Sequence, residues 1–230
     1  MKWNAVPGIA CLLSFMLPVG VIIYNRYYKH RSLAALLTYY ILSAINIMMI
    51  MDLVPLSASI RNNFILTSIY LAVPVVLTSL LFFCPNKPRQ RIVNFLILSF
   101  ISYEILITAY NGFNPVTAGY ILGPGLLLIF GHSSFLFVRH VKFAIMHGKN
   151  QGRTLMLSSM LFAYACYILI YYFYFIQKTP DTADTLLLYF ISSFITAIIM
   201  ALGLHLMRKR MKELRTLRTT RKELALFFSN

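Results

Sequence analysis

Seven runs of apolar residues, each about long enough to cross a bilayer, divide this chain of 230 residues. The runs lie near residues 5–24, 32–53, 64–84, 92–111, 118–138, 154–176 and 184–207. About 20 apolar residues in an α-helix span the hydrocarbon core of a membrane. The sequence therefore predicts an all-α integral membrane protein, in which residues 1–207 form a bundle of seven transmembrane helices.

The charge content agrees with this interpretation. Only 12% of the residues are charged, which is too few to cover the surface of a soluble domain, and the mean hydropathy is +0.73. A net charge of +15 is also typical of nucleic-acid-binding proteins. Here the basic residues form short clusters between apolar runs, so we expect contact with the anionic inner leaflet of the lipid bilayer and no nucleic acid.

The positions of lysine and arginine predict the orientation. Eighteen of the 21 follow the first, third, fifth or seventh run, and only Lys2, Arg61 and Lys178 lie on the other side. Cytoplasmic loops of membrane proteins retain the positive charge. We therefore expect the N-terminus outside and the C-terminal residues 208–230 in the cytoplasm. The connections are short, so neighbouring helices should pack antiparallel.

Glu104 is the only acidic residue well inside a run. A charge at that depth is costly, so such residues usually face the interior of the bundle. At about 1.5 Å per residue, several other groups lie near the same height: Asn46, Tyr70, Pro124, Tyr164, Tyr167, Ser192 and Ser193. This layer predicts a binding site for an unknown small ligand. The alternative is a structural hydrogen-bond network that fixes the register of the helices.

The fifth run contains the sequence Gly123-Pro124-Gly125. Proline removes a backbone donor and glycine adds flexibility, so the helix could break there and line a binding site. Small residues also allow helices to pack closely around a kink. The sequence supports both interpretations equally.

Four tyrosines of the sixth run, Tyr164, Tyr167, Tyr171 and Tyr174, follow one another at steps of 3, 4 and 3 residues, on one helix face. The deeper pair, Tyr164 and Tyr167, could line a cavity, because a buried phenol needs a hydrogen-bond partner. Tyr171, Tyr172 and Tyr174 lie where aromatic residues commonly gather at the membrane interface. We expect these three to form such a belt.

No catalytic or metal-binding motif is found. The three cysteines lie far apart, and no His/Cys spacing that binds a metal, phosphate loop or nucleophile elbow occurs. A lone carboxylate also lacks a partner for acid–base catalysis. We therefore expect no metal and no cofactor, and an intramembrane enzyme is the least favoured function.

Residues 208–230 combine an apolar stripe at helical spacing with basic residues. Such a helix could continue the seventh span, lie along the inner leaflet, or dock a cytoplasmic protein partner. We favour the membrane surface, with partner docking second. The residues expected to make either contact are Arg208, Lys209, Arg210, Lys212, Leu214 and Leu217.

In size, helix number and orientation the chain resembles the microbial rhodopsins and the small sugar transporters with seven helices. The resemblance is limited to topology. Retinal requires a lysine in the seventh span, and residues 184–207 contain none. The sugar transporters have prolines in matched helices, and 32–53 and 154–176 contain none.

Three functions fit these features. The first is a sensor that binds a small ligand in a polar cavity within the membrane and signals to a cytoplasmic partner. The second is a small-solute or proton-coupled transporter, and the third is an accessory subunit of a membrane complex. The outer loops contain no glycosylation acceptor, so a bacterial inner membrane is the simplest location.

Overall fold

The computed structural model describes the backbone of residues 5–84, 86–147, 150–177 and 182–227. Among these, it does not describe the side chains of residues 5, 147, 182, 183 and 209–227. Seven α-helices follow one another: α1 (Ala5–Tyr24), α2 (Arg31–Ile50), α3 (Ala58–Leu80), α4 (Lys87–Asn111), α5 (Pro115–His147), α6 (Gln151–Tyr171) and α7 (Thr182–Phe227). Each is long and apolar enough to cross a membrane. The prediction of an all-α, multi-pass membrane protein is confirmed to this extent.

Several helices extend beyond the apolar runs that predict them. Helix α3 begins at Ala58, before Arg61, and α5 continues to His147 through Arg139 and Lys142. Hydrophobicity marks only the part of a helix that lies in hydrocarbon, whereas charged residues continue a helix readily once they reach water or headgroups. The length of an apolar run is therefore a lower limit on the length of the helix.

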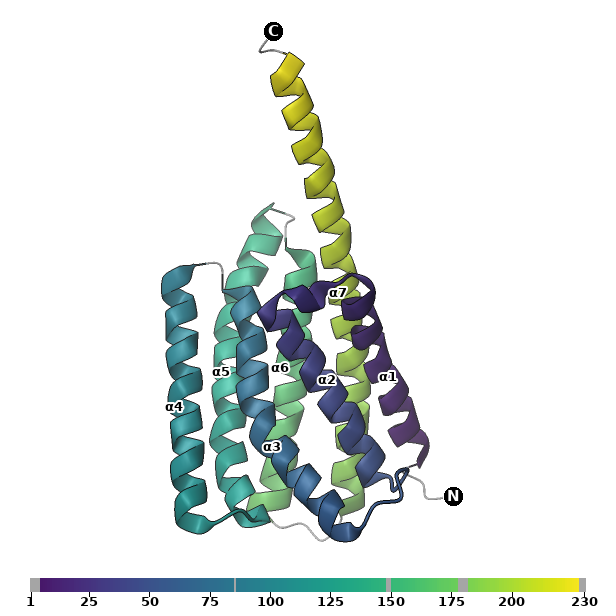
Figure 1. The fold of residues 1–230 in the computed structure, drawn as a ribbon, viewed down its shortest axis with the longest axis vertical. Helices are drawn as coiled ribbons and strands as arrows, with labels where there is room; N and C mark the ends of the chain where they lie inside the picture. The colour runs from purple at the N-terminus through teal and green to yellow at the C-terminus, as the bar shows by residue number, and fades with distance from the viewer. Residues whose placement is uncertain (1–4, 85, 148–149, 178–181, 228–230) are drawn as a thin grey trace.

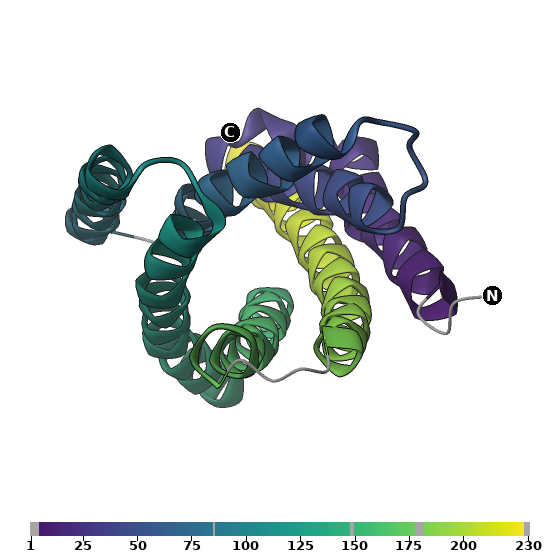
Figure 2. The same ribbon diagram turned by 90° about the horizontal axis from the view of Figure 1, so that it is seen from below.

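Six of the helices form a ring. Helix α1 packs against α2 and α7, α7 against α6, and α6 against α5; α3 closes the ring between α5 and α2. Figure 2 shows this arrangement along the helix axes. Helices that are neighbours in the sequence are therefore mostly neighbours in space, and the contacts of α1 with α7 and of α3 with α5 join helices that are distant in the sequence.

Helix α4 lies outside this ring. It packs against α3 and α5 and stands apart at one side of the bundle (Figure 2). Only 11% of its membrane-spanning window is buried, compared with 33–44% for the other six spans. The Tyr103 hydroxyl donates a hydrogen bond of 3.0 Å to the Tyr120 carbonyl of α5. Most of the α4 surface is therefore not covered by the other described helices.

The turn between α4 and α5 is defined by local chemistry. Gly112 ends α4 with φ 77°, a conformation that glycine adopts without steric cost. Asn114 caps α5, because its Oδ1 accepts a 2.8 Å hydrogen bond from the backbone N–H of Thr117. Pro115 is the first residue of α5, where a missing N–H is harmless.

Helices α6 and α7 are in close contact near one end of the bundle. A Cβ added to Gly152 would lie 2.6 Å from the Gly203 carbonyl oxygen and 2.7 Å from the backbone nitrogen of Met207. Further along the pair, the Ser159 hydroxyl donates a 2.9 Å hydrogen bond to the Thr196 carbonyl. Small residues thus let the two backbones approach, as they do in many membrane helix pairs.

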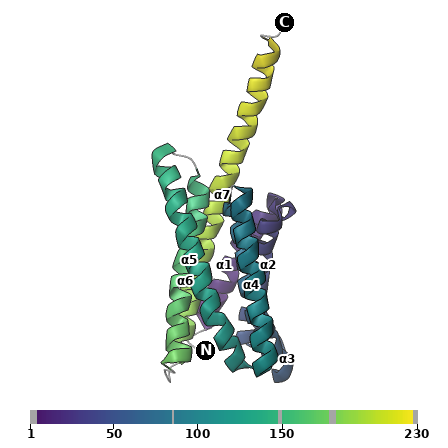
Figure 3. The ribbon, with the colours of Figure 1, turned by 90° about the vertical axis from the view of Figure 1, so that its left-hand side faces the viewer.

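Helix α7 continues past the other helices as one projecting helix (Figure 1). It is 46 residues long, about 69 Å, with no break near residue 207. Figure 3 shows that α5 also rises beyond α4, less far than α7. The backbone of the tail thus continues the seventh span as far as Phe227. The side chains of Lys209, Arg210, Lys212, Leu214 and Leu217 lie outside the described residues.

The base of the projecting helix is attached to α1. The Arg208 guanidinium lies 4.9 Å from the centre of the Tyr24 ring, and Arg153 of α6 lies 4.8 Å from the centre of the Phe82 ring. Both are cation–π contacts. The C-terminal ends of α1, α3 and α5 lie at this same end (Figure 1). The alternation of basic and non-basic connections along the sequence thus corresponds to two ends of the bundle.

Candidate functional site

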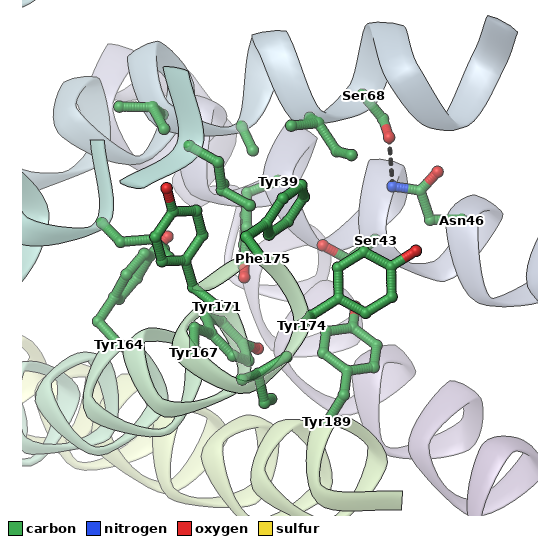
Figure 4. A pocket seen from close by; sticks show the side chains of 16 residues that line it. Tyr39, Ser43, Asn46, Ser68, Tyr164, Tyr167, Tyr171, Tyr174, Phe175 and Tyr189 are labelled. Carbon is green, nitrogen blue, oxygen red and sulfur yellow. Dashed lines mark hydrogen bonds between the residues drawn. The ribbon is translucent and has the colours of Figure 1, made fainter. Parts of the chain in front are cut away.

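A cavity of about 230 Å³ lies inside the helix ring, between α2, α3, α5, α6 and α7 (Figure 4). None of the residues that line it is charged. Six are tyrosines: Tyr39, Tyr164, Tyr167, Tyr171, Tyr174 and Tyr189. We call this space the tyrosine cavity. Its walls combine aromatic faces with hydroxyl groups, which suits a ligand that is largely apolar and makes a few hydrogen bonds.

The wall from α2 is formed by Tyr39, Ser43 and Asn46, which are spaced by 4 and 3 residues and therefore share one helix face. Asn46 Nδ2 donates a 2.5 Å hydrogen bond to the Ser68 hydroxyl of α3 (Figure 4). This bond joins two helices at the margin of the cavity.

One atom of the Asn46 amide has no hydrogen-bond partner among the described residues. The Ser68 hydroxyl uses its only proton to donate to the Ile65 carbonyl at 2.7 Å, so it must accept from the amide nitrogen of Asn46. This fixes the orientation of the amide. Asn46 Oδ1 is then buried with no hydrogen-bond partner among the residues that the structure describes. An acceptor at the margin of the cavity thus lacks a donor.

The opposite wall is formed by α6 and the turn that follows it. A single π-helical segment, Tyr172–Ile176, succeeds α6, and Tyr174 and Phe175 from it line the cavity. The Tyr171 and Phe175 rings stack with centroids 5.1 Å apart. We expected Tyr171, Tyr172 and Tyr174 in an interfacial belt. Tyr171 and Tyr174 line the cavity. Tyr174 is nevertheless 53% exposed, as Tyr172 is 48% exposed. The wider turn of a π-helix redirects side chains, and such segments are frequent at functional sites.

Two glycines of α5 make room for these rings. A Cβ added to Gly119 would lie 2.6 Å from the Phe175 ring, and one added to Gly123 would lie 2.6 Å from the Tyr171 hydroxyl. Helix α5 passes through Pro124 without ending, and Pro124 itself is exposed. Of the two interpretations of Gly123-Pro124-Gly125, the structure supports close packing through small residues.

Helix α7 contributes the remaining side of the tyrosine cavity. The hydroxyl groups of Tyr167 and Ser193 are hydrogen-bonded at 2.8 Å. The Tyr189 ring lies 5.7 Å from the Tyr167 ring, centre to centre. Ser192 is buried and donates to the Tyr189 carbonyl at 3.1 Å. The helix that projects beyond the bundle is therefore also part of the wall.

The eight predicted ligand-binding residues lie in different places. Three of them, Asn46, Tyr164 and Tyr167, line the tyrosine cavity. Ser192, Ser193 and Pro124 do not line it; the two serines are buried on α7, and Pro124 is exposed. Glu104 and Tyr70 line a separate groove between α3 and α4. The structure therefore does not bring the eight residues together in one site.

Several lining residues were not predicted from the sequence, notably Tyr39, Ser43, Ser68, Tyr189 and Phe175. A signal for the first two was present. Tyr39, Ser43 and Asn46 recur at helical spacing along an apolar run, and such a polar stripe on a membrane helix indicates the face that points inward. For Phe175 the sequence contains no comparable signal, because its position depends on the π-helical turn.

The groups at this site favour binding over covalent chemistry. Phenols, hydroxyls and one amide can orient a ligand, but none forms a nucleophile–base pair of the kind that catalysis uses. Among the described residues, no group of three or more His, Cys, Asp or Glu is placed to hold a metal ion. Comparisons with protein-family models, curated proteins and solved structures give no match.

Proposed function

We propose that this protein is a membrane sensor that binds a small, neutral organic molecule in the tyrosine cavity and signals through α7 to a cytoplasmic partner. The observation that carries the proposal is that α7 forms part of the cavity wall, through Tyr189, and continues beyond the bundle to Phe227. Occupancy of the cavity thus acts directly on the helix that projects.

The volume of the cavity limits the size of the ligand. An engineered cavity of about 150 Å³ accommodates benzene, and pockets for drug-sized ligands begin at about 300 Å³. At about 230 Å³, the tyrosine cavity suits one or two rings with few substituents.

The residues that line the cavity also limit the charge and polarity of the ligand. An ion would be buried without a counter-ion, which is costly, because none of the lining residues is charged. Ring faces favour an aromatic ligand, and Asn46 Oδ1 requires a hydrogen-bond donor. A phenol or an indole has these properties.

The remaining features of the proposal come from the sequence. The excess of lysine and arginine after alternate spans supports an N-terminus outside and a cytoplasmic tail that meets the anionic inner leaflet or a partner protein. A bacterial inner membrane is the proposed location.

Binding is tested by the thermal unfolding of the purified protein in lipid nanodiscs. Indole should raise Tm by several degrees at saturation, because a ligand at 100 times its Kd adds about 2.7 kcal/mol. 1-Methylindole, which lacks the N–H, should raise it much less. Ala72→Trp, which fills the cavity, and Asn46→Leu should remove the effect. Glu104→Gln, which lies outside the cavity, is the matched control. An equal response to indole and 1-methylindole, or an undiminished response in Ala72→Trp, would contradict the proposed site.

Signalling needs a second measurement. Spin labels at Ile145 of α5 and Leu206 of α7, both exposed near the end from which α7 projects, report the position of α7. Indole should change the distance distribution in the wild-type background and not in Asn46→Leu. Binding without any change, together with flux of indole into proteoliposomes, would favour the transporter function instead.

A further inference from the structure

The groove between α3 and α4 is a second candidate site, separate from the tyrosine cavity. It has a volume of about 570 Å³ and includes Glu104 of α4. Its rim is exposed, with Ile105 62% exposed, on the side of the bundle where α4 faces lipid. A molecule in this groove would come from the bilayer.

Two residues that line the groove each have a buried hydroxyl group with no hydrogen-bond partner among the described residues. The first belongs to Tyr70, which is only 8% exposed and whose ring packs on Phe113 at 5.0 Å. The second is Thr108 Oγ1, one helical turn after Glu104. Buried polar groups in proteins are nearly always paired. These two groups therefore indicate a polar partner that belongs in the groove.

The polar groups of the groove attract a cationic donor. The Glu104 carboxylate accepts hydrogen bonds, and the two hydroxyls can accept as well. Pro74 has no N–H, so the Tyr70 carbonyl of α3 also lacks its usual donor. The one ion pair among the described residues joins Arg61 and Asp52, so no basic side chain of the described chain neutralises Glu104.

Thr67 also lines the groove, and its hydroxyl donates to the Asn63 carbonyl at 2.8 Å. The other lining residues are apolar: Leu71, Pro74, Ile101, Ile105, Ala109 and Phe113. No lysine or arginine lines the groove, so a phosphate group would find no cation there. Glu104 is seven residues from the end of α4 at Asn111, about 10 Å along the helix axis. A head group anchored near that membrane surface can reach it.

We propose that this groove binds an amphiphilic amine from the bilayer, a molecule with a long apolar part, one ammonium group and no phosphate. The ammonium group pairs with Glu104 and donates to Tyr70 and Thr108, while the apolar part lies along Leu71 and Ile105. This inference is independent of the tyrosine cavity, and its failure would leave the proposed function unchanged.

The test measures binding of dodecylamine to the full-length protein in nanodiscs of phosphatidylcholine. Saturable binding to one site is expected. Glu104→Gln should weaken it about tenfold or more, and Tyr70→Phe several-fold, because charge-assisted hydrogen bonds are stronger than neutral ones. Ala72→Trp, which alters only the tyrosine cavity, should bind as the wild type does.

Two matched ligands separate charge from hydrogen bonding. Dodecanol has a donor but no charge, and dodecyltrimethylammonium has the charge but no N–H. Both should bind about tenfold more weakly than dodecylamine. Equal binding of either ligand, or equal affinity of wild type, Glu104→Gln and Tyr70→Phe for dodecylamine, would overturn the proposal. So would native mass spectrometry that shows a protein chain, lost in Glu104→Gln, in place of the amine.

Discussion

The hydroxyl groups of Tyr167 on α6 and Ser193 on α7 are hydrogen-bonded at 2.8 Å, at the edge of the tyrosine cavity. Either hydroxyl can be the donor. The bond joins α6, which contributes three of the six tyrosines of the cavity, to the helix that projects beyond the bundle. Together with the Ser159–Thr196 bond and the contact at Gly152 and Gly203, it makes α6 and α7 one structural unit.

A double-mutant cycle with Tyr167→Phe and Ser193→Ala should measure this link. Interhelical hydrogen bonds in membrane proteins contribute about 0.6 kcal/mol on average, and up to about 1.7. We expect a coupling energy in that range from the free energies of unfolding of the wild type, both single variants and the double variant. Strictly additive single effects would mean that the two hydroxyls do not interact.

Gly123→Ala should destabilise the protein by about 1–3 kcal/mol, because the new methyl group meets the Tyr171 ring. Gly131→Ala in the same helix is the control: it has nothing within 4 Å, and alanine favours the helix by up to about 1 kcal/mol. Steric trapping gives both free energies. A second substitution, Tyr171→Leu, should recover part of the loss in Gly123→Ala. Equal stability of the two alanine variants would argue against this packing.

Gly152→Ala should cost more than Gly123→Ala. The added Cβ would meet backbone atoms of Gly203 and Met207, which cannot rotate away as a side chain can, so α6 and α7 must separate. Gly20→Ala of α1, which meets nothing within 4 Å, serves as the neutral reference. The measurement is the same unfolding experiment, with the α6–α7 distance from spin labels as a second readout. A loss no greater than that of Gly20→Ala would contradict the close approach.

The proposed orientation is tested by labelling single cysteines. In a variant without Cys11, Cys84 and Cys166, Leu53→Cys tests the α2–α3 connection and Tyr28→Cys the α1–α2 turn; both positions are exposed. A membrane-impermeant maleimide should label Leu53→Cys in sealed right-side-out vesicles and Tyr28→Cys only after the membrane is opened. The reverse pattern would mean that the N-terminus is inside.

The number and character of the helices were predictable because both follow from the length of apolar runs. The composition of the site was less predictable. Distance along a helix gives the depth of a residue, and Glu104, Asn46 and Tyr70 were placed at similar depths in that way. The direction in which each side chain points is set by packing between helices. Helix α4 lies outside the ring, so Glu104 faces a groove at the lipid while Asn46 faces the cavity.

The packing role of the glycines in α5 is clear from the structure but not from the sequence. Gly119 and Gly123 are one turn apart on α5, and Phe175 and Tyr171 are one turn apart on the opposing segment. Each glycine faces one ring. Two short patterns that match in this way, far apart in the sequence, were visible only after the helices were known to be neighbours.

The length of α7 has a mechanical consequence. Residues 208–227 extend about 30 Å beyond the point where Arg208 meets Tyr24. A tilt of about 5° at that point moves the far end of a rigid rod of this length by roughly 2–3 Å. A rotation of the helix about its own axis turns the far end by the same angle. The projecting helix thus acts as a rigid lever that pivots at the contact between Arg208 and Tyr24. A rearrangement around Tyr189 that leaves the bundle almost unchanged would present a different surface at the other end of the lever.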